Sequence, residues 1–201
     1  MIAVFRLLNS LPVLYLVMLW PGRFAVQGLF EDWYYPQMMY DTGVWSVRLM
    51  LLTIAVSPTL VLINRLGRGR AIGKWLLQRR RHFGLGSFVY AALHLVHYVL
   101  ETADLTEMAI EFVLLEYFVG WLAFFFIAAL AITSNNWSTR KLGTKWKRLH
   151  YWIYPAFILI FWHWYLLDFF TGRVLFWIAI FISIKIIHSL FKRVPRLRHQ
   201  T

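Results

Sequence analysis

Six stretches of mostly apolar residues, each about as long as a bilayer is thick, constrain this chain more than any other feature. A helix needs about 20 such residues to cross the hydrocarbon core of a membrane. Only 15% of the 201 residues are charged, against roughly a quarter in a soluble domain, and most of them fall between these stretches. The sequence therefore predicts an all-α integral membrane protein with a single domain over residues 1–201. The expected spans are 3–20, 44–63, 83–100, 112–132, 151–167 and 174–190.

The charged residues predict the orientation of this bundle. The connections 65–81 and 140–148 and the tail 192–201 contain many basic residues and no acidic one. Every Asp and Glu lies in or beside the other connections, up to Asp168. Cytoplasmic loops carry the excess of Lys and Arg, so we expect six helices with both termini in the cytoplasm. The net charge of +12 is then a topology signal that also attracts anionic membrane lipid, and it does not indicate nucleic-acid binding.

The absence of cysteine limits the chemistry of any bound group. It excludes disulfides, iron–sulfur clusters, thiolate-ligated haem and covalent haem attachment through a CxxCH motif. Any haem is therefore held by nitrogen ligands. Glycines at 67, 69 and 73 do not follow a strand, so they are a poor match to a dinucleotide-binding fingerprint. No nucleophile lies beside a base in the pattern, and hydrolysis has no support.

Histidines lie at matched positions in the third and fifth expected spans. His94 and His163 are deep in the apolar runs, whereas His82 and His150 stand at the cytoplasmic ends, 12 and 13 residues earlier. The two spans run in the same direction, so each pair shares a depth, roughly 18–20 Å from the other pair. Imidazole is a standard axial ligand of haem iron, and histidine within a span is usually functional. We expect one or two haems between these helices.

The inner pair has alternative interpretations. On a straight helix His150 and His163 point about 140° apart, so they cannot face the same partner helix. Either Pro155 kinks the helix between them or His150 belongs to the loop. His82 is equally well explained as a structural residue at the membrane boundary.

Other residues near the expected site also have two interpretations. His97, one turn beyond the outer ligand, is either an alternative ligand or a hydrogen-bond partner. Arg80 and Arg81 could meet haem propionates, although the positive-inside rule alone explains them. We do not expect His188 or His199 to be ligands.

Two motifs around these histidines resemble a known family. The pattern RRxxGLxxFxYxxLHL runs from Arg80 to Leu95, and KLGxxWxxLHxxxY runs from Lys141 to Tyr154. Both are similar to the YedZ/MsrQ family, the haem-binding membrane subunit of the bacterial periplasmic methionine sulfoxide reductase system. That family belongs to the ferric reductase-like transmembrane superfamily, alongside NADPH oxidases. Further similarity lies at residues 41–53, 57–58 and 131–134.

The resemblance implies a six-helix ferric reductase-like transmembrane domain in the bacterial inner membrane. It implies b-type haem bound by His94 and His163, with His150 as a further haem-related residue; the family pattern does not require histidine at His82. It also implies FMN, and electron transfer from a cytoplasmic flavin reductase or quinone to a periplasmic molybdopterin-containing methionine sulfoxide reductase. No flavin- or nicotinamide-binding domain follows the sixth span, so we expect an electron-transfer subunit of an oxidoreductase complex, not a complete enzyme.

Two other functions are compatible with the same residues. One is a ferric or quinone reductase-type membrane cytochrome that acts without the periplasmic partner. The other is a haem-free transporter or scaffold, in which the buried histidines bind protons or another metal.

Overall fold

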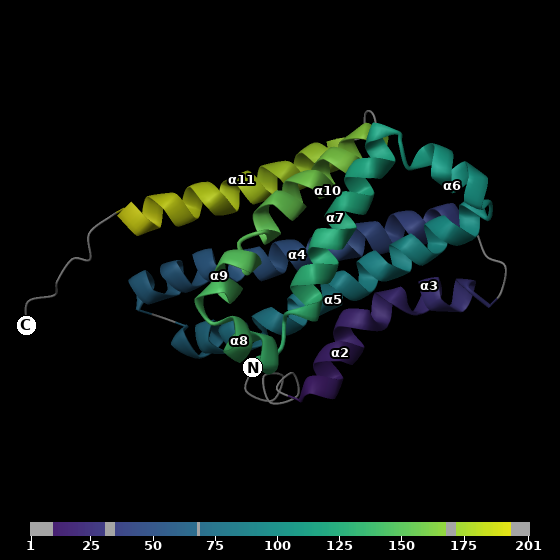
Figure 1. Ribbon diagram of the computed structural model, residues 1–201. Helices are drawn as coiled ribbons and strands as arrows, with labels where there is room; N and C mark the ends of the chain where they lie inside the picture. Colours follow the sequence, from purple (N-terminus) through teal and green to yellow (C-terminus); the bar gives the residue numbers. More distant parts are fainter. Residues whose placement is uncertain (1–9, 31–34, 68, 168–171, 194–201) are drawn as a thin grey trace, which may run out of the picture.

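All the elements of the described chain are helical. The computed structural model describes residues 10–30, 35–67, 69–167 and 172–193 (Figure 1). Asp168 and His199 lie outside the described residues. The elements are α2 (Leu11–Leu19), the 3-10 helix η1 (Trp20–Gly22), α3 (Arg23–Gly28), α4 (Tyr35–Leu66), α5 (Arg70–Thr102), α6 (Leu105–Glu111), α7 (Leu115–Ile132), α8 (Asn136–Leu142), α9 (Thr144–His150), α10 (Ile153–Leu167) and α11 (Gly172–Arg193).

Four helices in the described part of the chain are long and apolar enough to cross a membrane. They lie within α4, α5, α7 and α11 and correspond to the second, third, fourth and sixth expected spans. The fifth expected span is α10, whose 15 residues are fewer than the roughly 20 needed for a full crossing. The first expected span includes residues 1–9, which are outside the described residues, and α2 is its described part. The multi-span helical membrane domain is confirmed, and the number six stays a prediction.

Several helices extend beyond the apolar runs that predicted them. α4 begins at Tyr35 and α5 at Arg70, so parts of two expected loops are helical. Hydrophobicity marks only the part of a helix inside the bilayer, and the helix continues until a residue stops it. After α4 and before α5 that residue is glycine: Gly67 and Gly69 both have positive φ, at 65° and 80°. The expected outer loop after Trp20 likewise contains η1 and α3.

Helices α4 and α5 form an antiparallel pair held by a reciprocal hydrogen bond in its interior. The Ser46 hydroxyl donates to the Ser87 carbonyl oxygen at 2.9 Å, and the Ser87 hydroxyl donates to the Ser46 carbonyl oxygen at the same distance. Both serines are buried. Small hydroxyl residues let two helix backbones approach closely while satisfying each other inside a membrane.

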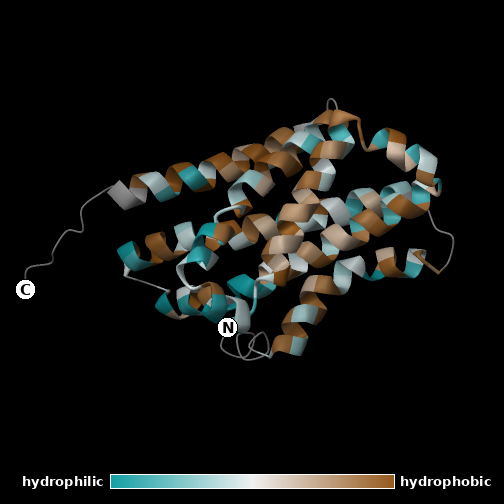
Figure 2. Ribbon diagram, viewed as in Figure 1, coloured by the Kyte–Doolittle hydropathy of each residue, from teal (hydrophilic) through white to brown (hydrophobic). Residues whose placement is uncertain are grey.

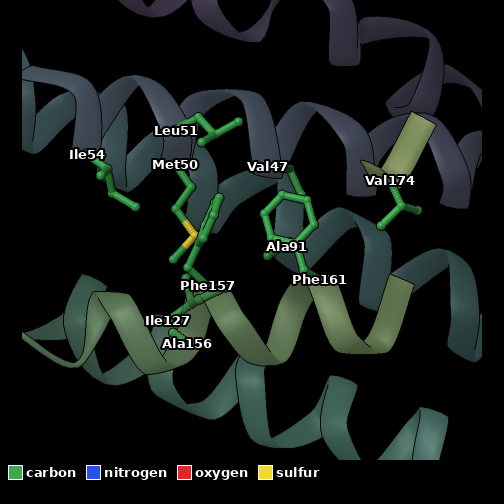
Figure 3. Packing of buried hydrophobic residues seen from close by; sticks show 10 residues of the cluster. All are labelled: Val47, Met50, Leu51, Ile54, Ala91, Ile127, Ala156, Phe157, Phe161 and Val174. Carbon is green, nitrogen blue, oxygen red and sulfur yellow. The ribbon is translucent and has the colours of Figure 1, made fainter. Parts of the chain in front are cut away.

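The main hydrophobic core lies where α10 packs between α4, α7 and α11 (Figure 3). Phe157 and Ala156 of α10 are almost completely buried, at 1% and 0% exposure. This core places α10 next to α4 and α7, the helices that flank the site described below. Its buried residues are Val47, Met50, Leu51, Ile54, Ala91, Ile127, Ala156, Phe157, Phe161 and Val174.

Polar residues gather at the two ends of the bundle (Figure 2). α8, α9 and the basic first part of α5 lie at one end, and the acidic helix α6 lies at the opposite end (Figures 1 and 2). Large apolar side chains on the outward faces of α7 and α11 are exposed, among them Phe125 at 58% and Ile186 at 52%. Exposed apolar surface of this extent is typical of helices that contact lipid.

Candidate functional site

The structure brings His94 of α5 and His163 of α10 together. Their ring centroids are 6.2 Å apart, and the ring planes are almost perpendicular, at 86°. Two imidazoles bound on opposite sides of one metal ion, with bonds of about 2.0–2.1 Å, have ring centres about 6 Å apart. The predicted pair is therefore at the separation that a shared metal requires.

Each histidine of the pair is held by a backbone carbonyl through the same ring nitrogen. His94 Nδ1 donates to the carbonyl oxygen of Met39 at 2.8 Å, and His163 Nδ1 donates to that of Glu116 at 2.6 Å. A carbonyl oxygen can only accept, so the proton of each neutral ring is on Nδ1. Nε2 of each ring then keeps its lone pair, which is the state a metal ligand requires.

Two glycines make these approaches possible. Gly43 and Gly120 lie four residues after Met39 and Glu116, so their N–H groups are the helical donors to the same two carbonyls. A Cβ at Gly43 would lie 3.0 Å from Nδ1 of His94, and one at Gly120 would lie 2.7 Å from Nδ1 of His163. Any larger residue at these positions would push the ring away from its carbonyl.

Reasoning from the sequence missed this supporting shell. Gly120 stands alone within a strongly apolar span, and a glycine inside a helix often marks a close approach of another group. That signal was present but does not identify which group approaches. The two carbonyls have no side-chain signature at all, because any residue supplies one.

His150 lies apart from the pair, at the basic end of the bundle. It is the last residue of α9, and α10 begins at Ile153, so the chain is not one continuous helix between His150 and His163. The structure differs from both alternatives for this segment: His150 ends the helix α9 and is not in a loop, and no single span is kinked at Pro155. Pro155 lies in the first turn of α10, where proline is tolerated. The direction of the His150 side chain is therefore not fixed relative to His163 by one straight helix.

The partners of His150 come from α7 and α9. Its ring stacks on Trp146 with centroids 3.9 Å apart, and its Nε2 lies 3.2 Å from the Thr133 hydroxyl. That hydroxyl donates to the Ala129 carbonyl, so Nε2–H is the donor to Thr133. Burial lowers the pKa of His150, and the nearby positive charges of Arg80 and Arg81 lower it further. A hydrogen bond with the Thr133 backbone raises this pKa and offsets part of the decrease.

His82 has a different partner, in α2. The Tyr15 hydroxyl lies 2.8 Å from Nδ1 of His82, and the two rings meet edge to face. His82 and His150 therefore each contact another residue of the protein, and an inner site formed by these two stays a prediction.

The remaining candidates are placed as follows. His97 is fully buried, and its ring lies beside the backbone of Ala25 in α3. Arg81 donates to the side-chain oxygen of Asn136 at 2.9 Å, which joins α5 to α8. Arg80 lies near His150. His188 is partly buried in α11.

The donor set suits haem. His94 and His163 would hold the iron of a b-type haem through their Nε2 atoms, since imidazole is a standard protein ligand of haem iron. Among the described residues, no group of three or more His, Asp or Glu side chains is placed to hold a metal ion by itself. The pair therefore fits a macrocyclic cofactor better than a bare ion.

Comparison with known proteins agrees with this chemistry. Residues 42–161 match the family described as "Ferric reductase like transmembrane component". The matched range contains His94 and His150 and ends two residues before His163. No solved structure matches the chain.

Relatives with curated names are similar over a shorter range. The "Protein-methionine-sulfoxide reductase heme-binding subunit MsrQ" of Brucella ovis, of Brucella canis and of Brucella suis are each 34% identical to the chain over 117 residues. The match covers 57% of this chain and 49% of each relative, so the chain spans about half the length of the curated relatives it matches. These matches confirm the resemblance predicted from the two histidine motifs.

Proposed function

Because the chain belongs to the ferric reductase-like transmembrane family, we propose that it is a membrane electron-transfer subunit with b-type haem held by His94 and His163. One observation carries this proposal. The ring centroids of two imidazoles on different helices lie 6.2 Å apart, and each ring is anchored through Nδ1 to a carbonyl.

The residues around the pair would orient and tune the ligands. Haem, when bound, supplies a one-electron couple at its iron. The carbonyls of Met39 and Glu116 hold the rings in one tautomer and one orientation, and hydrogen bonding at Nδ1 makes each Nε2 a stronger donor. Gly43 and Gly120 keep the anchoring carbonyls accessible. Helices carry all these groups, and no loop does. We therefore expect the ligands to move little when the charge of the haem iron changes.

The two ends of the bundle support a proposed direction of electron transfer. The His94–His163 pair lies toward the end that carries the acidic helix α6, since Met39 and Glu116 are within the first five residues of α4 and α7. His150 lies at the basic end with Arg80. With six spans and both termini in the cytoplasm, the pair would be close to the periplasm. Electrons would then pass from a cytoplasmic flavin reductase or quinone toward a periplasmic molybdopterin-containing methionine sulfoxide reductase.

Reporter fusions test that orientation. Fusions at Gly69 and Asn136 should report the cytoplasmic side of the inner membrane, and a fusion at Asp104 should report the periplasmic side. The reverse pattern would contradict the direction of electron transfer as well as the topology.

Two cofactor expectations from the resemblance stay predictions. They are a second haem near His82 and His150, and an FMN. The ratio of haem to protein and a flavin extraction from the purified protein measure both directly.

An optical experiment tests the proposed function. The purified protein should give a b-type spectrum after reduction with dithionite, and the reduced haem should be reoxidised when methionine sulfoxide and the periplasmic reductase are added together. Reoxidation by ferric iron or a quinone alone, with no response to the reductase, would support a stand-alone reductase instead. A protein with no Soret band would leave only a transporter or scaffold.

A further inference from the structure

A cavity lies on the flank of the bundle, between α4 and α11. Its volume is about 540 Å³, which is within the range of small-molecule sites. The cavity combines charged and aromatic side chains in a part of the structure that the haem proposal does not use. The residues that matter for its chemistry are Tyr40, Asp41, Trp45, Arg48, Arg173 and Trp177.

Of the residues that line this cavity, Arg48 says most about the ligand. It belongs to a membrane-spanning segment, where an ionisable side chain usually marks a functional site. Its guanidinium lies 4.6 Å from the ring centre of Trp45 and 5.6 Å from that of Trp177. Its Nε–H is buried and has no hydrogen-bond acceptor among the described residues. The aromatic rings stabilise the cation, but no carboxylate or other acceptor of the described residues is hydrogen-bonded to this Nε–H.

Together with Arg48, the other charged residues of the cavity, Arg173 and Asp41, give it a net charge of +1. Arg173, at the start of α11, donates to the Tyr40 hydroxyl at 3.0 Å. Asp41 is the one carboxylate among the lining residues and accepts from Gln37 at 3.0 Å. Two guanidinium groups and one carboxylate complement a ligand with a single negative charge.

The position of the cavity favours a ligand that comes from the membrane. Trp177 is four residues beyond Arg173, which is about 6 Å along α11. Because the Arg48 guanidinium lies beside Trp177, it is about 6 Å from the start of α11 along the helix. That depth corresponds to the boundary between lipid headgroups and acyl chains. The outward side is apolar and open, with Phe176 58% exposed and Leu175 62% exposed.

This cavity is separate from the histidine pair. Gly43 of α4 faces His94, and Arg48 follows five residues later, roughly 140° around the helix. A ligand beside Arg48 would therefore contact a different face of α4.

We propose that this cavity binds one anionic phospholipid, with the phosphate diester between Arg48 and Arg173. A guanidinium forms paired, charge-assisted hydrogen bonds with phosphate oxygens, and basic pockets between membrane helices bind lipid headgroups. Trp45 and Trp177 contact the glycerol and upper acyl chains, as tryptophan does at membrane boundaries.

Native mass spectrometry of the detergent-purified full chain tests this site. The probes are phosphatidylglycerol, a diacylglycerol with the same acyl chains, a quinone analogue and inorganic phosphate as a competitor. We expect one phosphatidylglycerol to be retained per protein, no retention of the diacylglycerol, and no displacement by inorganic phosphate. Arg48→Gln should weaken retention about tenfold, since it removes charge-assisted hydrogen bonds. Asp41→Asn should strengthen it, since it raises the net charge of the cavity.

A matched control and a folding control accompany these variants. Arg23→Gln removes an exposed cation of α3 that stacks on Trp20 and Phe24, outside the cavity, and should bind as the unsubstituted protein does. Size-exclusion profiles show whether each variant is folded; if Arg48→Gln is not, the opposite effect of Asp41→Asn still tests the site. Unchanged retention in both cavity variants would overturn the proposal. Displacement by inorganic phosphate, or equal retention of the diacylglycerol or quinone, would show a different ligand and overturn it too.

Discussion

His163 lies so close to Gly120 that a Cβ atom on the glycine would be 2.7 Å from the Nδ1 atom of the imidazole. The same relationship recurs between His94 and Gly43, at 3.0 Å. In both cases the imidazole donates to the carbonyl four residues before the glycine. The site is thus built twice from one unit: a helix carbonyl, a glycine one turn later, and an incoming histidine.

Gly120→Ala should disturb the site through this contact. The added methyl group would force the His163 ring away from the Glu116 carbonyl, with an overpacking cost of about 1–3 kcal/mol. We expect less bound haem and a lower melting temperature, measured by absorbance and by scanning fluorimetry.

Gly84→Ala is the matched control, because it adds the same methyl group to a helix of the same bundle. The nearest atom to its Cβ would be Thr53 Cγ2 at 3.8 Å, an ordinary contact. Alanine also favours the helix by up to about 1 kcal/mol, so this variant should keep its haem and its stability. Equal haem loss in the two variants would mean that the close contact at Gly120 is not what positions His163.

The sequence predicted the class of fold and the outer histidine pair for identifiable reasons. Apolar length marks membrane helices, and His94 and His163 are conspicuous because a polar ring inside a span needs a partner. The helices α4 and α5 extend beyond the predicted spans, because hydropathy does not record where a helix starts or stops in water. The carbonyl anchors were missed because backbone groups have no sequence signature. The break before Ile153 separates His150 from α10, and Pro155 alone did not distinguish a kink from a helix start.

The reciprocal bond between Ser46 and Ser87 should behave as one unit. Ser46→Ala removes a hydroxyl that donates across the α4–α5 interface and should destabilise the protein by about 0.6–2 kcal/mol, and Ser87→Ala should do the same. The two hydroxyls also contact each other at 3.3 Å, so the double variant should lose less than the sum of the single variants. A reversible unfolding assay in mixed micelles measures the three values, and strict additivity would contradict the coupling.

The charge state of His150 should make stability depend on pH. Its pKa in the folded protein is lowered from 6.5 by burial and by Arg80 and Arg81. The unfolded chain therefore takes up a proton first as the pH falls below about 6.5, and folded-state stability decreases there. We expect the melting temperature to fall between pH 7.5 and 5.5, and to fall less in His150→Gln, which keeps a donor for Thr133. Identical pH profiles of the two proteins would contradict this role for His150.

The perpendicular rings of His94 and His163 predict a spectroscopic signature. If the ring planes stay 86° apart when haem is bound, the two imidazoles would interact with different d orbitals of the iron, and those orbitals would stay close in energy. We expect a strongly anisotropic low-spin signal from the oxidised protein in electron paramagnetic resonance. A rhombic signal typical of parallel imidazole planes would show that the rings rotate when the iron binds.

The haem content of histidine variants tests the central claim most directly. The haem-to-protein ratio should fall in His94→Ala and His163→Ala by the full amount held at the outer site, and added imidazole should restore part of it. His150→Ala should leave that site largely intact and affect an inner haem or electron entry, and His82→Ala should be milder. His188→Ala, a partly buried histidine of α11, is the control and should keep its full haem. Full haem with an unchanged reduction potential in both His94→Ala and His163→Ala would contradict the assignment of this pair as the haem ligands.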